Sequence, residues 1–235
     1  MLPRSPGADR VGPGDLGVIE QILPGGVASA ESFADPPDAV VFSEEAAIVA
    51  KAVDERRREF TTARSCARRA LTSLGMAPAP ILPGERGAPQ WPPGIVGSIT
   101  HCTGYRAAAV ARIRDMLTIG VDAEPNDVLP DGVLEVVSLA GERARLRDLA
   151  AAAPGVCWDR LLFSAKESVY KAWFPLTRCW LGFEEADITI NAGDGTFDAH
   201  LLVPAPAFGG SPLADLTGCW LACAGLVVTA ITLPV

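Results

Sequence analysis

The stretch FSAKESVYK, residues 163–171, sets two lysines and one glutamate among bulky apolar side chains. Glu167 and Lys171 lie four residues apart, so a helix places them on one face, one turn from each other. Lys166 is rotated by about 100° from Glu167 and flanks that face. A carboxylate between two ammonium groups suits a metal-bound phosphate, whose negative charge must be held by cations. The alternative is an ordinary surface ion pair, which a single pattern of this kind favours.

Length and composition indicate a globular protein. The 235 residues are 49% apolar and 20% charged, enough for one large or two small domains with a sizeable core. The formal net charge of −8 argues against nucleic-acid binding. Residues 1–16, rich in proline and glycine, have no apolar signal core and are expected to be a disordered extension. The charge-free residues 220–235 are too short for a membrane span, so no membrane partner is expected.

The cysteines indicate the compartment. The six cysteines form no C-x-x-C pair, and the chain has only two histidines, so a zinc cluster is not expected. Buried free thiols in a reducing cytoplasm fit this pattern. The protein is therefore expected to be cytoplasmic.

The first half of the chain is expected to begin irregularly over residues 19–38 and then to form a helix from Ser43 to Leu74. Apolar residues recur there at spacings of three and four, as on a helix that faces a core. Arg56 falls on this stripe and Arg64 on its edge. Either both arginines bury the aliphatic part of the side chain and extend the guanidinium group into water, or they border a cavity that contains an anion.

Polar side chains gather at the end of a predicted hairpin. A loop rich in proline, residues 78–93, precedes a strand over residues 95–100 and a returning strand over residues 105–113. Ser98, Thr100 and His101 therefore lie at or near a strand end, where polar groups can face a ligand. A structural role is the alternative for His101.

A second acidic motif ends the next predicted strand, residues 117–124. Asp122 and Glu124 are two residues apart, so both carboxylates project from the same side of the strand. Like charges this close repel each other unless a cation or solvent intervenes. The pair suits Mg²⁺, which prefers oxygen ligands, although a solvated strand end is the alternative.

The second half repeats the mixture of helices and antiparallel strands. Helices are expected over residues 133–151 and 158–173, with Pro175 interrupting the second helical pattern. Hairpins follow over residues 188–202 and around Ala224-Gly225. No sequence repeat is strong enough to demonstrate duplication.

Three blocks taken together resemble a known family. They are GSITH (97–101), IGVDAE (119–124) and Phe163-x-x-Lys166-Glu167-x-x-x-Lys171. In order and spacing they are similar to the signature blocks of the 4′-phosphopantetheinyl transferases. The length is similar to that of the monomeric Sfp-type branch, and the chain looks closest to actinobacterial enzymes that serve fatty-acid, polyketide and nonribosomal-peptide synthases.

The resemblance implies an α+β fold, a pseudo-twofold pair of similar lobes, each a small antiparallel sheet packed with helices. The lobes would span residues 17–114 and 115–235, with the last strands packing back on the first lobe. Coenzyme A would bind in the cleft, and its phosphopantetheine arm would pass to a serine of an acyl or peptidyl carrier protein, releasing adenosine 3′,5′-bisphosphate.

The resemblance also implies the site residues. Asp122, Glu124 and Glu167 would hold Mg²⁺, or Mn²⁺ in its place. Coenzyme A phosphates would meet a polar and cationic set: Arg56, Arg64, Ser98, Thr100, His101, Lys166 and Lys171. Lys171 would steady the departing group, and Glu167 is the candidate base for the attacking serine.

One position departs from the family pattern, and two other functions remain open. Some relatives have a lysine just before the glycine of the loop rich in proline, where this chain has Pro83, and Arg86 is the candidate to supply that charge. Trp173, Phe174 and Leu181 are either core residues or an apolar patch for the carrier. The alternative functions are a magnesium-dependent hydrolase of nucleotide pyrophosphates and a non-catalytic module that binds coenzyme A or a carrier.

Overall fold

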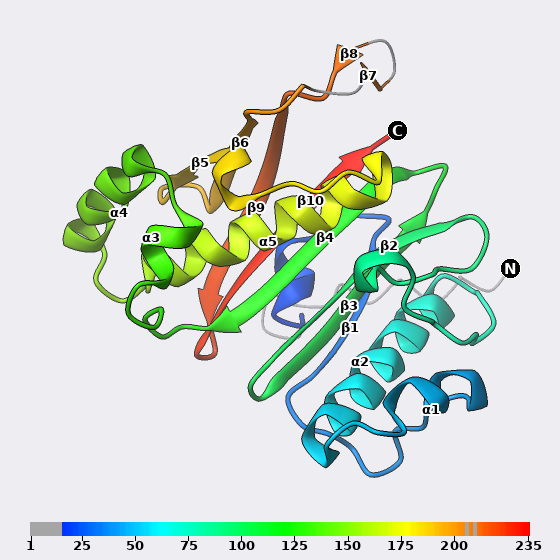
Figure 1. Ribbon diagram of the computed structural model, residues 1–235. Coiled ribbons are helices and arrows are strands. Elements are labelled where there is room, and N and C mark those ends of the chain that lie inside the picture. The colour runs from blue at the N-terminus through cyan, green and yellow to red at the C-terminus, as the bar shows by residue number, and fades with distance from the viewer. Residues whose placement is uncertain (1–15, 205–206, 209–210) are drawn as a thin grey trace, which may run out of the picture.

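Two antiparallel sheets, each packed against a helix of 20 residues, form the two lobes of an α+β protein (Figure 1). The structure is a computed structural model that describes residues 16–204, 207–208 and 211–235. Within these residues the first sheet has the strand order β1-β3-β2 and the second the order β4-β10-β9-β6-β5. A short two-stranded ribbon, β7-β8, stands apart from both sheets (Figure 1). The predicted extension falls almost wholly on residues 1–15, which lie outside the described part.

The first lobe contains the elements η1 (Ile19–Ile22), β1 (Ala28–Ser32), α1 (Ser43–Val49), α2 (Asp54–Ser73), η2 (Glu85–Gly87), β2 (Ile95–Cys102) and β3 (Tyr105–Arg112). The second contains β4 (Met116–Pro125), α3 (Val133–Val137), α4 (Ala140–Ala152), α5 (Trp158–Thr177), η3 (Phe183–Glu185), β5 (Ala186–Asn191), β6 (Thr196–Leu201), β7 (Ala207–Phe208), β8 (Ser211–Pro212), β9 (Asp215–Cys223) and β10 (Leu226–Pro234).

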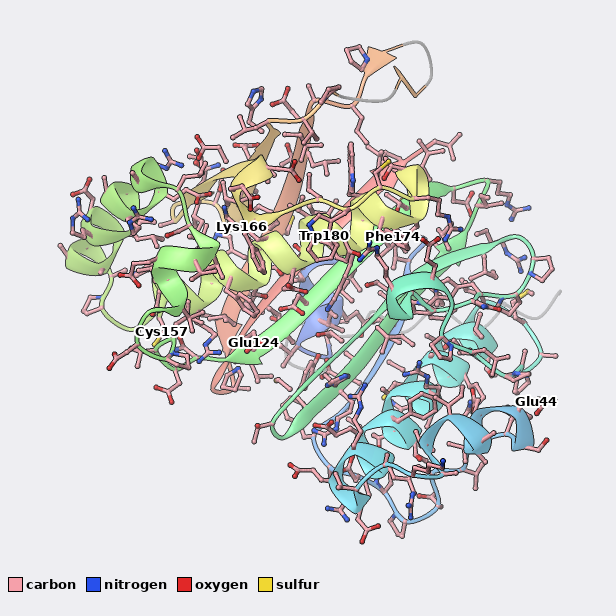
Figure 2. The ribbon with its side chains drawn as sticks, in the orientation of Figure 1. Glu44, Glu124, Cys157, Lys166, Phe174 and Trp180 are labelled. Carbon is pink, nitrogen blue, oxygen red and sulfur yellow. The ribbon has the colours of Figure 1, made fainter. Side chains whose placement is uncertain are left out.

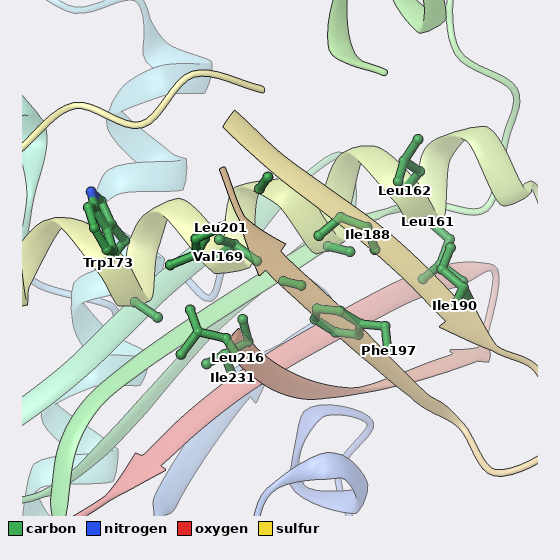
Figure 3. Close-up of a cluster of buried hydrophobic side chains, with 14 of the residues drawn as sticks. Leu161, Leu162, Val169, Trp173, Ile188, Ile190, Phe197, Leu201, Leu216 and Ile231 are labelled. Carbon is green, nitrogen blue, oxygen red and sulfur yellow. The ribbon is translucent and has the colours of Figure 1, made fainter. Parts of the chain in front are cut away.

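Three buried apolar cores hold the layers together. Strand β3 serves two of them, because Ala108 and Val110 pack with α2 while Ala107 and Ala109 face a core shared with β4 and β10. The third core lies between α5 and the second sheet (Figure 3), and Figure 3 labels ten of its members: Leu161, Leu162, Val169, Trp173, Ile188, Ile190, Phe197, Leu201, Leu216 and Ile231. The shared core joins the last strand of the chain to the first lobe.

Two of the three helices expected in the sequence analysis are divided, which corrects two expectations. The helix expected from Ser43 to Leu74 breaks at residues 50–53, where Val53 has an extended backbone and 72% of its side chain exposed. Asp54 and Glu55 then begin a second helix at the positive end of its dipole. The helix expected over residues 133–151 breaks at Ser138 and Leu139, which are both extended.

Two further expectations are corrected. Helix α5 continues through Pro175 to Thr177, since a proline so close to the helix end removes a single backbone hydrogen bond. The segment expected to be irregular contains strand β1, which pairs with β3. The predicted hairpins β2–β3, β5–β6 and β9–β10 and the strand β4 are confirmed.

A buried glutamate occupies a corresponding place in each lobe. Glu45 is the third residue of α1 and pairs with Arg68 of α2 at 2.9 Å. Glu142 is the third residue of α4 and pairs with Lys166 of α5, also at 2.9 Å. Each lobe therefore contains a capping glutamate that is neutralised by a cation from its long helix.

Strand β4 connects the lobes through side chains of β2, although the two strands belong to different sheets. The Ser98 hydroxyl accepts a hydrogen bond from the Val121 N–H at 3.1 Å, and the Thr100 hydroxyl accepts one from the Ala123 N–H at 3.0 Å. Both hydroxyls are buried and replace the carbonyls that a paired strand would offer. The edges of the two sheets are thereby held in register.

Strand β4 also lies unusually close to α5. A Cβ atom on Gly120 would come within 2.0 Å of the Ser168 carbonyl oxygen and 2.6 Å of the Ala172 nitrogen. Only glycine fits this position, because both neighbouring atoms belong to the backbone of a helix that cannot move independently.

We expect Gly120→Ala to lower the free energy of unfolding by about 1–3 kcal/mol, because the added methyl group must push α5 away from β4. Chemical denaturation measures the change. Gly193→Ala is the matched control, since a Cβ there meets nothing within 4 Å. Equal stability of the Gly120 variant and the control would contradict the close approach.

We expect Thr100→Val to lower the free energy of unfolding by about 1–3 kcal/mol, because the buried Ala123 N–H loses its acceptor. Thr217→Val, at an exposed position of β9, should change it by no more than about 0.5 kcal/mol. The same denaturation measurement checks both variants, and an unchanged Thr100 variant would show that the hydroxyl does not join the lobes.

Candidate functional site

A cavity of about 1010 Å³ lies between the two lobes. The first lobe contributes α2, the loop at residues 83–91 and strand β2, while the second contributes the start of β4 and the C-terminal half of α5. Seven of the predicted site residues line it: Arg56, Arg64, Arg86, Ser98, His101, Glu167 and Lys171. Thr100, Asp122, Glu124 and Lys166 lie outside its lining.

The wall formed by the first lobe is cationic. Arg56 donates a hydrogen bond to Nε2 of His101 at 2.9 Å, which holds that ring nitrogen unprotonated. Burial lowers the pKa of His101, and the neighbouring Arg56 lowers it further. Arg64 stacks over the Phe60 ring at 3.8 Å, and burial lowers its pKa to about 10. Both arginines of the α2 stripe therefore border the cavity, where they can meet an anion.

A ring of contacts centred on Asp122 lies at the edge of the cavity. Lys171 donates to Oδ1 of Asp122 at 2.7 Å and to the Val121 carbonyl oxygen at 3.2 Å. The Thr100 hydroxyl donates to the same Oδ1 at 3.2 Å. The other oxygen, Oδ2, is buried and has no hydrogen-bond partner among the described residues. A buried carboxylate oxygen without a partner is costly unless a cation or donor completes its shell.

Glu124 and Glu167 supply two further carboxylates near Asp122. Burial and the charge of Asp122 raise the pKa of Glu124 to about 7, although Arg160 lies 3.1 Å from its carboxylate. Burial also raises the pKa of Glu167, against the lowering effect of Lys171. Burial is the main cause of both raised pKa values, because it disfavours the ionised carboxylates, and the negative charge of Asp122 adds to the effect.

The three carboxylates form only part of a metal site. Among the described residues no three acidic, histidine or cysteine side chains converge closely enough to hold an ion as they stand. Glu124 is turned toward Arg160, and Asp122 uses one oxygen on Lys171. The chemistry of the set nevertheless fits a hard cation, because it offers carboxylate oxygens, includes the unpartnered Oδ2 of Asp122 and repels itself without an ion.

Lys166 lies on another side of α5 from the cavity. Its ammonium group contacts Glu142 at 2.9 Å and donates to the carbonyl oxygens of Phe183 and Ala186 at 2.6 and 2.9 Å. Figure 2 shows Lys166 beside the segment that leads into β5, with Glu124 across the helix at the end of β4. The structure therefore offers no free ammonium at Lys166 for a pyrophosphate, in contrast to the expectation from the resemblance.

Arg86 closes the cavity from the first lobe. Its guanidinium lies 5.0 Å from the ring of Trp180, which follows α5 in the second lobe, and its backbone has a φ of 52°. Trp180 also packs against Tyr170, with 5.1 Å between ring centroids. A non-glycine residue in this strained conformation is held there by its surroundings, as is common at functional sites.

Several residues of the site escaped the sequence analysis. Arg160 lies seven residues before Glu167, so helical spacing alone places both on one face of α5 and offers a signal. Tyr170 has the same signal, because it lies three residues after Glu167, whereas Trp180 and Glu142 have none. Trp173, Phe174 and Leu181 are buried, so the structure assigns them to the core and not to an exposed patch.

Two general features accompany the site. All six cysteines lie in the described part of the chain and are free thiols. Across residues 16–204, 207–208 and 211–235, no helix combines the length and apolar character that crossing a bilayer requires.

Comparison with protein families gives two adjoining matches. Residues 44–111 match the 4′-phosphopantetheinyl transferase N-terminal domain. Residues 118–203 match the 4′-phosphopantetheinyl transferase superfamily. The two matches divide at the turn between β3 and β4, so each covers most of one sheet and its long helix.

Curated relatives agree with the family matches. The chain is 56% identical over 217 residues to the 4′-phosphopantetheinyl transferase Svp of Streptomyces mobaraensis, covering 91% of this chain and 88% of the relative. It is 49% identical over 224 residues to the 4′-phosphopantetheinyl transferase PptT of Mycobacterium tuberculosis, covering 92% and 98%. Enterobactin synthase component D of Salmonella typhi is 35% identical over 155 residues, covering 66% and 62%. The chain belongs to the 4′-phosphopantetheinyl transferase superfamily.

Proposed function

We propose that this chain transfers the 4′-phosphopantetheine group of coenzyme A to a serine of acyl and peptidyl carrier proteins. Adenosine 3′,5′-bisphosphate is the second product. The observation that supports this most is the cavity between the lobes, with arginines and a histidine on one wall, Glu167 and Lys171 on the other, and Asp122 bound to Lys171 behind it. Such a cavity suits a nucleotide with several phosphates and a reaction that breaks a pyrophosphate.

The cationic wall binds the nucleotide end of coenzyme A. Arg56, His101, Arg64 and Arg86 all line the cavity and offer donors that match phosphate oxygens. Bringing a phosphate to His101 favours its protonated form, since the added anion opposes the effect of Arg56. Ser98 faces the same cavity, but its hydroxyl already accepts the Val121 N–H and contributes mainly to the lobe junction.

Glu167 takes the proton of the attacking serine. It lines the cavity one helical turn from Lys171, and its pKa is raised by burial, which makes it a better proton acceptor than an exposed carboxylate. Lys171 lies between Asp122 and the cavity, so its charge can stabilise the departing phosphate.

Asp122, Glu124 and Glu167 would hold Mg²⁺, or Mn²⁺ in its place. When bound, the ion neutralises negative charge on the pyrophosphate and thereby lowers the activation free energy of phosphoryl transfer. Asp122 would contribute the oxygen that lacks a partner among the described residues, and Glu124, which here pairs with Arg160, would supply a further carboxylate. Lys166 and Thr100 do not bind phosphate in this proposal, because the Lys166 ammonium group donates to the Ala186 carbonyl oxygen and the Thr100 hydroxyl accepts the Ala123 N–H.

Further properties follow from this proposal. The partners are carrier domains of fatty-acid, polyketide and nonribosomal-peptide synthases. The enzyme works as a monomer, because one chain supplies both walls of the cavity. Residues 17–114 and 115–235 form the two lobes, and the free thiols suit a reducing cytoplasm.

Mass spectrometry of an apo carrier protein incubated with the enzyme, coenzyme A and Mg²⁺ tests the reaction. We expect the carrier to gain the mass of one phosphopantetheine group on serine. Breakdown of coenzyme A without carrier modification would instead indicate a hydrolase, and an unchanged mixture would indicate a binding module. Either result would overturn the proposal.

We expect Glu167→Gln to reduce transfer by about 10²- to 10⁴-fold, because the variant loses a base but little volume. Binding of coenzyme A, measured by calorimetry, should stay within a few-fold of the wild-type value. Glu135→Gln, on an exposed turn of α3, is the control and should retain full activity. Near-normal turnover of the Glu167 variant would refute its role.

Asp122→Ala should weaken the dependence on Mg²⁺ together with the activity. A titration of the transfer rate against Mg²⁺ concentration measures this, and an unchanged titration curve would count against Asp122 as a ligand.

A further inference from the structure

A second, smaller cavity of about 190 Å³ lies beside the main one. One of its walls is helix α5, through Lys166, Glu167 and Tyr170, and the other is the segment from Trp180 to Ala186. Glu167 and Tyr170 line both cavities, so the position of the segment determines what surrounds the carboxylate of Glu167.

Lys166 joins the two walls of the small cavity. Its ammonium group donates to the carbonyl oxygens of Phe183 and Ala186 in the segment and to the carboxylate of Glu142. These three contacts use all three N–H donors of Lys166. Only 2% of the Lys166 side chain and none of the Glu142 side chain is exposed. A fully paired buried ammonium group at the junction of two segments fixes their separation.

Glu142 extends this network to a third element. Its Oε1 accepts a hydrogen bond from the Ile188 N–H at 2.7 Å, and its Oε2 accepts one from the Leu139 N–H at 2.6 Å. The carboxylate therefore ties the start of α4 to strand β5, directly after the segment that Lys166 holds. Helices α4 and α5 and strand β5 meet at this single ion pair.

The first lobe contains the same arrangement. Glu45 caps α1, pairs with Arg68 and accepts the Ile81 N–H at 2.8 Å, just before the loop that carries Arg86. Arg68 belongs to the lining of neither described cavity, so its charge serves the position of a chain segment. By analogy between the lobes, Lys166 also fixes the position of a chain segment.

We propose that Lys166 and Glu142 are positioning residues that hold the Trp180–Ala186 segment against α5, and that Lys166 binds no substrate phosphate. The proposal rests on the proposed function, in which Glu167 takes the proton from serine. Loss of the pair lets the segment move away from α5 and changes the surroundings of Glu167 and Tyr170.

Calorimetric titrations with adenosine 3′,5′-bisphosphate and with coenzyme A, which retains the whole pyrophosphate, separate positioning from phosphate binding. We expect Lys166→Met to leave both dissociation constants within about threefold of the wild-type values, while removal of a charged phosphate ligand would raise at least one of them about tenfold or more. Any rise beyond about threefold overturns the proposal.

Glu142→Gln provides a second variant, which keeps Lys166 and most of the volume. We expect hydrogen–deuterium exchange to accelerate over residues 180–188 and transfer to fall by about 10²-fold, because small displacements at a reacting centre have effects of this size. If Lys166 were a phosphate ligand, this variant would release it and binding of the bisphosphate would be unchanged or tighter, with no loss of transfer. That outcome also overturns the proposal.

The double variant Glu142→Leu with Lys166→Met separates positioning from simple stability. An apolar pair of similar volume should raise the melting temperature above that of Lys166→Met, since no buried charge is left unpaired, although the N–H groups of Ile188 and Leu139 lose their acceptor. The carbonyl oxygens of Phe183 and Ala186 still lack their donor, so transfer should stay low and exchange fast. Recovery of transfer together with stability would contradict a positioning role.

Asp187→Asn is the matched control, because Asp187 pairs with Arg145 across the same junction of α4 and β5 but at a half-exposed position. We expect wild-type exchange over residues 180–188 in this variant. Bisphosphate binding and hydrogen exchange need no turnover, so they test the pair even if the wild-type protein modifies no carrier. Failure of the proposed function and failure of this inference are therefore distinguishable.

Discussion

The close approach of β4 to α5 at Gly120 is the constraint on which the site depends. No side chain separates the two elements there, and the Thr118 hydroxyl donates to the Ala172 carbonyl oxygen at 2.9 Å beside the contact. This approach carries Asp122, two residues further along the strand, to within hydrogen-bond distance of Lys171. Hydroxyl groups of β2 hold the other edge of β4. One strand therefore connects both walls of the cavity, and a rigid scaffold of this kind keeps catalytic groups in position.

Charge in the protein is divided between two tasks. Outside the lining of the main cavity, the buried ions Glu45 and Arg68, and Glu142 and Lys166, are paired and hydrogen-bonded. At the cavity the balance is incomplete, because Glu124 has a pKa raised to about 7 and Oδ2 of Asp122 has no partner among the described residues. Saturated pairs stabilise geometry, whereas an unbalanced cluster is prepared for a ligand that completes it.

The two lobes are similar in their side-chain contacts, although the residues that make these contacts differ. The two capping glutamates hold equivalent places, but their cations are an arginine in one lobe and a lysine in the other. Each glutamate also accepts an N–H from a segment that leads to or from a cavity wall. The two lobes therefore share an arrangement of contacts, although no repeat is evident along the sequence.

The amino-acid sequence by itself determined the hairpins, strand β4 and the helical face shared by Glu167 and Lys171, because turn residues and side-chain periodicity act over a few neighbouring positions. Its three blocks also indicated the family. Only the tertiary structure decided the breaks within the two long helical patterns, the direction of Lys166 and the partners of Ser98 and Thr100. Lys166 and Ser98 meet groups more than 15 residues away, Ala186 and Val121. Local pattern places a polar side chain on a face, but the packing of distant segments selects the group that it meets.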